Sequence, residues 1–366
     1  MSQIQTEVIA GVGLITLNRP EALNALSLQM VIDLTTVFTD WRDNPAVEVV
    51  AIRGSNKRGL FGAFCAGGDI RFFHDAAIAN DPALDRFFTA EYSLNNLLYS
   101  FPKPYVAFMD GVIMGGGMGL AQGADLRIVT ERTKMAMPET NIGLFPDVGG
   151  GFFLSRCPGH LGEYLALTGQ MLIGADALAA SLADGIASSD ALPDLWESLT
   201  TNTQLSAAER FEQLADLVCA PSPVSAPDWL SPQIDSIFAL PTVIDIITTL
   251  EQTPGDWASR TAHCLRQRSP LMLHVSLEQV RRGRHLSMAD DLRMERNIVH
   301  HCFNTQHLGR RGITSETVEG IRALAVDKDN APKWQPARIE EITIEMVEPF
   351  FTSPWPDDQH PLANLD

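Results

Sequence analysis

The alternation of strand-like and helix-like segments in the first half of the chain most constrains its fold. The β-branched segment GVGLITLNRP (11–20) is followed by LSLQMVIDLTTVFTDW (26–41), whose apolar residues recur at steps of three and four. The apolar segment VEVVAIRG (47–54) comes next, and the strand-like segments KPYVAFMDG (103–111) and LRIVTERT (126–133) come later. This order predicts an α/β fold with parallel strand pairing.

The character of the sequence changes after Thr200. The segment CAPSPVSAPDWLSP (219–232) is rich in proline and alanine, which predicts a linker or a long surface loop over residues 218–232. We expect a core at 1–217 and a helical region at 233–350, because LHVSLEQVRRGRHLSMADDLRMERNIVHHCF (273–303) has a helical pattern. The last residues, 351–366, are expected to form a tail.

Charge and cysteine content indicate which classes of partner and which cellular compartment to expect. The formal net charge of −18 opposes binding to a phosphate backbone, so a nucleic-acid partner is not expected. The five cysteines are scattered and odd in number, which favours free thiols in a reducing compartment. The N-terminal segment has neither a signal-peptide nor a transit-peptide pattern, and no apolar run approaches the length of a membrane span. We therefore expect a cytoplasmic protein with no membrane partner.

A predicted helix around residues 82–100 carries one carboxylate on its apolar face. Glu91 lies near the middle of the stripe formed by Leu84, Phe87, Phe88, Leu94 and Leu98. A buried carboxylate must find a partner or shift its pKa. A structural role, tied to an amide or an arginine, and a functional role are both open.

Two glycine-bearing turns follow two of the strands, FCAGGDI (64–70) and IMGGGMG (113–119). Neither has the spacing of a nucleotide-binding loop. Glycines at a strand-to-helix junction let backbone N–H groups approach a ligand, and two such turns could form an oxyanion hole. They could also serve only tight turns and close packing, and the glycines alone favour this second interpretation.

The segment MPETNIGLFPDVGGG (137–151) places two carboxylates, Glu139 and Asp147, each directly after a proline in an apolar setting. Pro138 and Pro146 fix the backbone beside them, which suits groups that must be positioned. Asp147 could instead cap a helix that starts near VGGGFFLSR, and Glu139 could be an exposed loop residue. We expect at least one of the two to have a raised pKa, as a general acid or base requires.

Five motifs together resemble the crotonase (enoyl-CoA hydratase/isomerase) superfamily, and specifically its 3-hydroxyisobutyryl-CoA hydrolase branch. They are LNRPEALNAL, FCAGGDIR, GVIMGGGMGL, MPETNIGLFPDVGGGFFLSR and VDKDNAPKWQP, and the resemblance extends from about Gly13 to Pro336. It implies a spiral of ββα units followed by a C-terminal helical region.

The resemblance also implies the site and the reaction. The oxyanion amides fall on Gly68 and Gly116, the catalytic carboxylates on Glu139 and Asp147, and the glutamate that contacts the substrate on Glu91. Further implied substrate-binding residues are Ala22, Leu23, Ala66, Asp69 and Ile70. The implied reaction is hydrolysis of a short 3-hydroxyacyl-CoA thioester, as in valine catabolism. Coenzyme A then enters only as part of the substrate, with no metal and no permanently bound cofactor, and the protein can form a homo-oligomer.

Two departures from the family pattern bear on these expectations. Family hydratases use a second glutamate at a position that is Gly119 here, so two-glutamate hydration is poorly supported. An isomerase using Glu139 alone and a CoA-binding scaffold without activity stay open as alternatives. Many relatives place a lysine for the CoA phosphates where Glu21 stands, and Arg53, Lys57 or Arg58 is the candidate to replace it.

Overall fold

The computed structural model describes residues 2–219, 227 and 229–366, and these residues form two compact units. The first unit comprises Met1–Gly68, Ser93–Ala136 and Met171–Ala226. The second comprises Asp69–Tyr92, Met137–Gln170 and Pro227–Asp366. The linker expected at 218–232 lies partly outside the described residues, and the domain boundaries stay a prediction.

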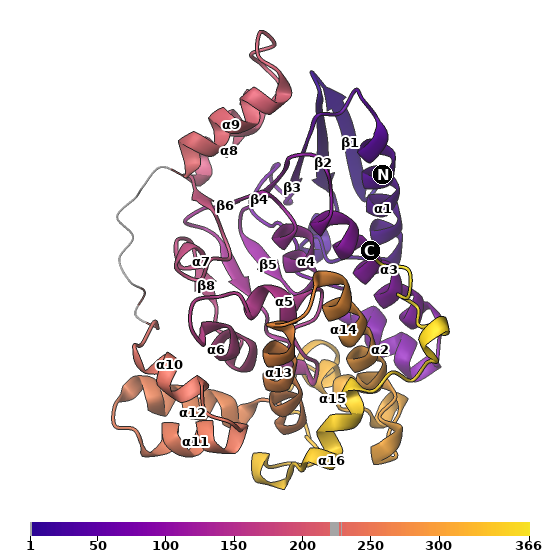
Figure 1. Ribbon diagram of the computed structural model, residues 1–366, viewed down its shortest axis with the longest axis vertical. Coiled ribbons are helices and arrows are strands. Elements are labelled where there is room, and N and C mark those ends of the chain that lie inside the picture. The colour runs from indigo at the N-terminus through magenta and orange to yellow at the C-terminus, as the bar shows by residue number, and fades with distance from the viewer. Residues whose placement is uncertain (1, 220–226, 228) are drawn as a thin grey trace. The chain divides into compact units, whose positions relative to one another are not determined.

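A six-stranded sheet forms the centre of the first unit (Figure 1). Its order is β1 (Ile4–Ile9), β2 (Val12–Leu17), β3 (Val49–Gly54), β4 (Tyr105–Met109), β6 (Leu126–Val129) and β9 (Gly185–Ile186). From β2 to β9 every neighbouring pair is parallel, as the sequence predicts, whereas β1 pairs antiparallel to β2.

Helices and a smaller sheet complete the first unit. Helix α1 (Leu28–Asp43) begins at Ser27, whose side chain accepts a hydrogen bond from the Met30 amide, and buries the apolar face that its sequence predicts. Helices α8 (Leu192–Ser198) and α9 (Ala207–Val218) cover apolar side chains of β2, β3, β4 and β6. The second sheet contains β5 (Val112–Met114), β7 (Lys134–Ala136) and β8 (Leu172–Ile173), accompanied by α4 (Gly116–Gln122) and α7 (Asp176–Ala179).

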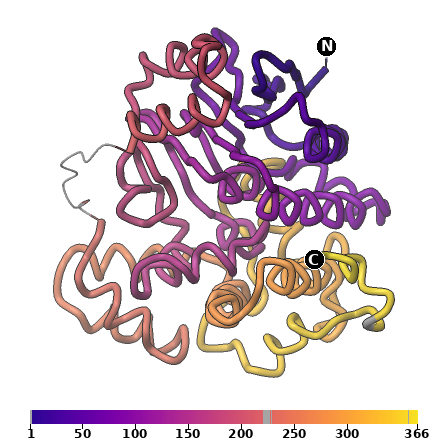
Figure 2. Tube along the Cα trace, turned by 45° about the horizontal axis from the view of Figure 1, so that its top comes forward, coloured from indigo at the N-terminus to yellow at the C-terminus, as the bar shows by residue number. Residues whose placement is uncertain are grey.

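The second unit is helical. It contains α2 (Ile70–Ala79), the N-terminal part of α3 (Ala83–Tyr99), the short helix η2 (Glu139–Ile142), α5 (Gly150–Leu154) and α6 (Leu161–Thr168). The later helices are α10 (Gln233–Phe238), α11 (Val243–Gln252), α12 (Asp256–Gln267), α13 (Pro270–Gly283), α14 (Met288–Phe303), α15 (Glu316–Ile321) and α16 (Ile344–Val347). Helices α13 and α14 confirm the helical pattern of 273–303. Figure 2 shows α10, α11 and α12 as one group, and α10 and α12 contact α6.

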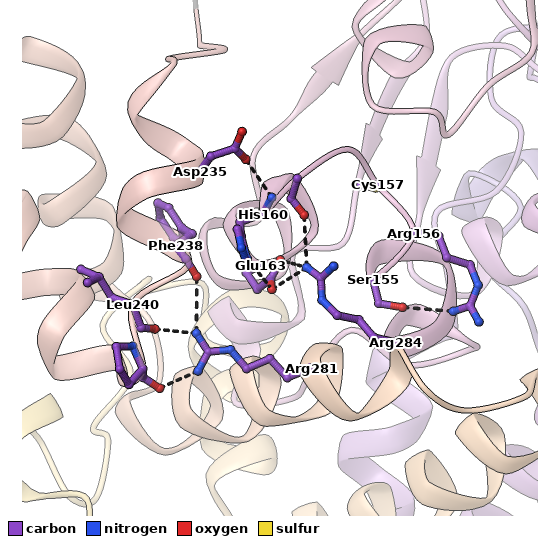
Figure 3. Close-up of polar contacts among 12 residues, drawn as sticks. Ser155, Arg156, Cys157, His160, Glu163, Asp235, Phe238, Leu240, Arg281 and Arg284 are labelled. Carbon is purple, nitrogen blue, oxygen red and sulfur yellow. Dashed lines mark hydrogen bonds and ion pairs between the residues drawn. The ribbon is translucent and has the colours of Figure 1, made fainter.

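Arginines at the C-terminal end of α13 tie that helix to its neighbours (Figure 3). The Arg284 guanidinium donates to both carboxylate oxygens of Glu163 on α6, at 2.7 and 2.8 Å. Glu163 is completely buried, so the ion pair is screened little by water. Arg281 donates to the backbone carbonyls of Leu240 and Pro241 after α10. These contacts fix α13, which also supports the candidate site.

The C-terminal residues pack on α14. Arg293 donates from Nε to the carbonyl of Leu362 at 3.0 Å, and the Leu362 side chain is buried. The Arg296 guanidinium lies 4.7 Å from the ring centre of Trp355. Within the described residues, no helix combines the length and the apolar character needed to cross a membrane.

Candidate active site

The backbone of residues 137–151 explains how the chain presents its two carboxylates. Glu139 is the first residue of η2, directly after Pro138, and this short helix ends at Gly143, where φ is +67°. Asp147 precedes two residues with positive φ, Val148 at +57° and Gly149 at +88°. A left-handed conformation at a β-branched residue such as Val148 is unusual and is characteristic of functional loops.

Three carboxyl groups of the second unit are buried and influence one another. The exposed fractions of Glu91, Glu139 and Asp147 are 2%, 6% and 5%. Burial raises the pKa of Glu139 and of Glu91 well above the ordinary value, and repulsion from Asp147 adds to both shifts. Burial also raises the pKa of Asp147, to about 7. The expectation of a raised pKa is thus confirmed for both residues of the motif, and Glu139 is not an exposed loop residue.

Glu91 and Glu139 each have one unsatisfied carboxyl oxygen, as Asp291 and Glu316 also do among the described residues. Within the described part of the chain, Glu91 Oε1 and Glu139 Oε2 are buried and have no hydrogen-bond partner. No amide or arginine of the described residues donates to the Glu91 side chain, whereas the Asp291 side chain accepts from the Phe152 amide. Glu91 is therefore a group with a shifted pKa and a free acceptor. Buried acceptors of this kind are available to a ligand.

Asp147 has a different partner from the one that a helix cap would have. Its Oδ2 accepts a hydrogen bond from the hydroxyl of Tyr92 at 2.8 Å. The side chain caps no helix, because α5 has Gly149 at its N-cap position and no side-chain cap there. The alternative interpretation of Asp147 as a helix cap is therefore wrong.

Two acidic residues of α14 take the place of that cap. Glu295 accepts hydrogen bonds from the amides of Gly149 and Gly151, and Asp291 accepts one from the amide of Phe152. Sequence reasoning missed both residues, as it missed Tyr92. Their signal was the spacing of four within ADDLRMER, which puts Asp291 and Glu295 on one side of a helix.

The two glycine turns of the first unit come together. A Cβ built on Gly67, whose φ is +95°, would lie 2.9 Å from the Met114 carbonyl and 3.4 Å from the Gly116 amide nitrogen. A Cβ on Gly117 would lie 2.4 Å from the Cys65 carbonyl oxygen. No other residue type would allow this approach.

The amides assigned to the oxyanion role are free in these turns. The N–H groups of Gly68 and Gly116 donate no hydrogen bond to the residues that the structure describes. Gly116 is buried and Gly68 partly buried, and a buried amide without a partner is rare in folded proteins. Close packing accounts for Gly67 and Gly117, and the free N–H groups of Gly68 and Gly116 remain available for a ligand.

The other residues implied in substrate binding belong to both units. In the first unit, Ala22 ends the short helix η1 (Pro20–Ala22), Leu23 is half exposed with φ +51°, and the Ala66 amide donates to the Leu23 carbonyl at 3.0 Å. In the second unit, Asp69 caps α2, whose first residue is Ile70. Their contact with substrate stays a prediction.

The cations considered for the CoA phosphates differ in their surroundings. The Arg53 guanidinium lies 4.0 Å from the ring centre of Trp196 and 5.2 Å from that of Phe61. Burial lowers the pKa of Arg53 to about 10. Lys57 and Arg58 are exposed. The Arg53 guanidinium thus packs against two aromatic rings within the fold, and its contact with a CoA phosphate stays a prediction.

Comparison with known proteins decides the family. The family model described as enoyl-CoA hydratase/isomerase matches residues 12–351. The chain belongs to this family. A 3-hydroxyisobutyryl-CoA hydrolase of Gallus gallus, described as mitochondrial, is 38% identical over 97% of this chain and 88% of its own length. The 3-hydroxyisobutyryl-CoA hydrolase 1 of Arabidopsis thaliana is 37% identical over 96% of this chain and 91% of its own length.

Solved structures of the family confirm the crotonase fold. A carnitinyl-CoA dehydratase from Mycobacterium thermoresistibile is 36% identical, with a TM-score of 0.86 and full coverage of both chains. An enoyl-CoA hydratase from Rhodobacter sphaeroides is 34% identical, with a TM-score of 0.82 over 96% of this chain and 98% of its own. The similarity includes the C-terminal helical region, because both matches extend over nearly the whole chain.

Proposed function

We propose that this member of the enoyl-CoA hydratase/isomerase family hydrolyses a short 3-hydroxyacyl-CoA thioester to the free acid and coenzyme A. The proposed preferred substrate is 3-hydroxyisobutyryl-CoA. The proposal rests on one observation. The carboxyl groups of Glu91, Glu139 and Asp147 are buried together, and the position of the second hydratase glutamate is occupied by Gly119. Curated relatives named 3-hydroxyisobutyryl-CoA hydrolase, at 37–38% identity, support the choice of substrate.

Gly68 and Gly116 would stabilise the charge that develops on the thioester oxygen. Their N–H groups are unused by the described residues, so they need not give up another hydrogen bond when the substrate binds. An oxyanion donor contributes on the order of 3 kcal/mol to transition-state stabilisation. The thioester carbonyl becomes more electrophilic as a result.

Glu139 would act by one of two routes, either as the nucleophile or as the general base. Its carboxylate either adds to the acyl carbon and expels the thiolate, giving a mixed anhydride that water then hydrolyses, or it removes a proton from a water that attacks directly. Both routes consume one water and release the acid and the thiol. Burial raises the pKa of Glu139 above its ordinary value, which makes it a stronger base than an exposed glutamate.

Asp147 would transfer a proton during the reaction, and Glu91 would bind the hydroxyl group of the substrate. With a pKa of about 7, Asp147 exchanges a proton readily at neutral pH, so it can protonate the departing thiolate or orient Glu139. The unpaired Oε1 of Glu91 can accept a hydrogen bond from the 3-hydroxyl. A buried acceptor of this kind rejects substrates that lack the hydroxyl, because it would then stay unpaired.

Hydration of an enoyl-CoA is the second candidate reaction. It is favoured by the names of the two similar structures, an enoyl-CoA hydratase and a carnitinyl-CoA dehydratase. Hydration by two glutamates would need a carboxylate at the position of Gly119, which has none. The two reactions differ in product, because only hydrolysis releases a thiol.

The remaining expectations on cofactor, assembly and compartment belong to the same proposal. Coenzyme A enters as part of the substrate, and no permanent cofactor is required by the chemistry above. A homo-oligomer and a cytoplasmic location rest on the sequence, whereas the vertebrate relatives are described as mitochondrial. Cell fractionation with an antibody to the protein separates the two compartments.

The test is release of free thiol from 3-hydroxyisobutyryl-CoA, followed with a thiol reagent, together with hydration of crotonyl-CoA by the same preparation. Glu139→Gln should lower the rate of thiol release about 10³-fold, within the range for a general base. Glu212→Gln, on an exposed position of α9, is the matched control and should keep the wild-type rate. Hydration without thiol release would establish the hydratase, and acyl-CoA binding without turnover would establish a scaffold.

A further inference from the structure

Three backbone amides at the start of α5 point at two carboxylates from α14. Glu295 accepts from the Gly149 amide at 2.7 Å through Oε2 and from the Gly151 amide at 2.9 Å through Oε1. Asp291 accepts from the Phe152 amide at 2.9 Å. Both side chains are completely buried. The amides at the beginning of α5 are therefore satisfied from a segment about 140 residues later in the chain.

A third residue holds the other side of Asp147. The Gln279 amide, on α13, donates from Nε2 to the Pro146 carbonyl at 2.6 Å and to Glu295 Oε1 at 2.9 Å. Asp147 thus lies between two fixed backbone groups, the carbonyl of Pro146 before it and the amide of Gly149 after it. Two anchor points this close leave the intervening backbone little freedom.

The glycines that follow Asp147 make this arrangement possible. Gly149 has φ +88°, which glycine adopts at no steric cost. A Cβ on Gly151 would lie 2.4 Å from Asp291 Oδ1, so a side chain there would exclude the carboxylate. The run of glycines in PDVGGG thus lets the two carboxylates of α14 reach the backbone amides.

The far end of α5 is held as well. Arg156 donates from Nη1 to the Phe152 carbonyl at 2.8 Å and to the Gly283 carbonyl at 3.2 Å. Figure 3 shows Arg156 with Ser155 at this end, and the ion pair of Arg284 with Glu163 beside it. Acidic groups at the N-terminal end and a cation near the C-terminal end match the direction of the helix dipole.

We propose that Asp291, Glu295 and Gln279 are positioning residues that hold Asp147 in its catalytic orientation, an inference that rests on the proposed role of Asp147 in thioester hydrolysis. They act through the backbone on either side of Asp147 and do not touch the substrate. The orientation of a reacting group can change a rate about 100-fold for a displacement near 1 Å.

Electrostatics supports the same arrangement. Burial raises the pKa of Glu295 and of Asp291, the latter to about 7, whereas the amides of Gly149 and Gly151 act in the opposite direction on Glu295. A buried acidic pair is costly unless it forms hydrogen bonds. The cost is offset here because the amides of Gly149, Gly151 and Phe152 gain acceptors, which orders the loop.

The kinetic test is a double-mutant cycle on thiol release. Glu295→Gln keeps the shape of the side chain but presents an amide group to N–H donors, so we expect kcat to fall about 10- to 100-fold with KM within about twofold of wild type. In an Asp147→Asn background the same substitution should change kcat by less than about twofold, because the group being positioned is already lost. An equal loss in both backgrounds would mean a general structural role and would overturn the proposal.

Gln279→Met provides a second variant, because it removes the donor while conserving volume. Its loss in kcat should be smaller than that of Glu295→Gln and should likewise disappear in the Asp147→Asn background. This variant keeps the test available if Glu295→Gln does not fold. The matched control is Glu278→Gln, a partly exposed neighbour on α13 that pairs with Arg282 and should leave kcat unchanged.

Hydrogen exchange separates this inference from the proposed function. Deuterium uptake of the peptide covering residues 144–157 should rise in Glu295→Gln and stay at the wild-type level in Glu278→Gln. This holds even if the wild-type protein releases no thiol, in which case the proposed function fails while the loop attachment is still tested. Unchanged uptake in Glu295→Gln would show that the carboxylate does not hold the loop, and would refute the positioning role.

Discussion

The hydroxyl of Tyr92 donates a hydrogen bond to Asp147 Oδ2 at 2.8 Å, and both residues are buried in the second unit. Burial raises the pKa of Asp147 to about 7, and the hydrogen bond from Tyr92 acts in the opposite direction because it favours the ionised form. Tyr92 thus keeps the pKa of Asp147 near neutrality, where proton transfer is most effective.

Substitution of Tyr92 by phenylalanine should raise the pKa of Asp147 further. A hydrogen bond to a charged group contributes about 1.5–3 kcal/mol, and 1.36 kcal/mol corresponds to one pKa unit. We therefore expect the Asp147 step in the pH profile of kcat to move upward by about one to two pH units in Tyr92→Phe. The measurement is the rate of thiol release between pH 5 and 9.

Tyr105→Phe is the control for this shift. The Tyr105 hydroxyl is equally buried and donates to the Leu120 carbonyl in the first unit, so its loss removes a hydrogen bond without involving Asp147. Its pH profile should coincide with that of the wild type. A downward move of the profile in Tyr92→Phe would contradict the direction assigned to this bond.

Glu91 should determine whether the enzyme requires a 3-hydroxyl group. The wild type should hydrolyse 3-hydroxyisobutyryl-CoA at least about 100-fold faster than isobutyryl-CoA in kcat/KM, because the latter leaves a buried carboxyl oxygen unpaired. Glu91→Leu should reduce this ratio to near one, whereas Glu91→Gln, which still offers an acceptor, should retain part of it. A ratio that is the same in Glu91→Leu and in the wild type would exclude Glu91 as the group that recognises the hydroxyl.

Local patterns in the sequence were sufficient for much of the fold. The steps of three and four in 26–41 correspond to α1, and the apolar segments 47–54 and 103–111 correspond to the buried strands β3 and β4. Burial of Glu91 also followed from its place on the apolar face of a predicted helix. These features depend on neighbours within one or two turns of the same element, so periodicity reveals them.

Contacts between distant segments could not be predicted in the same way. Tyr92 and Asp147 are 55 positions apart, and Glu295 lies 146 positions after Gly149. Nothing in the local sequence around Asp147 indicates that its helix-capping function is taken by α14. Strand β1 was missed for a related reason, because it has one buried residue and therefore no apolar pattern. Such elements are defined by the partner that they pair with.

The raised pKa of Asp147 predicts that its burial destabilises the protein at neutral and alkaline pH. The pKa is 3.8 in an unperturbed side chain and about 7 in the folded protein. Between these values the folded state binds more protons than the unfolded state, so stability falls as the pH rises through this window. Three pKa units amount to about 4 kcal/mol, of which about 3 kcal/mol is lost between pH 5 and pH 8.

Asp147→Asn should therefore stabilise the protein more at pH 8 than at pH 5. Relative to wild type, the gain in free energy of unfolding should grow by about 3 kcal/mol between these two pH values, while thiol release is lost. Denaturant titrations of both proteins at pH 5, 6.5 and 8 measure the difference. A gain that is constant with pH would mean that Asp147 has an ordinary pKa in the folded protein.

Gly151→Ala should disturb both stability and activity, because the new methyl group would lie 2.4 Å from Asp291 Oδ1. Forcing such a group into a packed site costs about 1–3 kcal/mol in free energy of unfolding. The displaced carboxylate would also release the Phe152 amide, so thiol release should fall together with stability. Gly59→Ala is the matched control, because no atom lies within 4 Å of a Cβ at that position, and its free energy of unfolding should stay within about 0.5 kcal/mol of wild type. Equal behaviour of the two alanine variants would contradict the close approach of Asp291 to the start of α5.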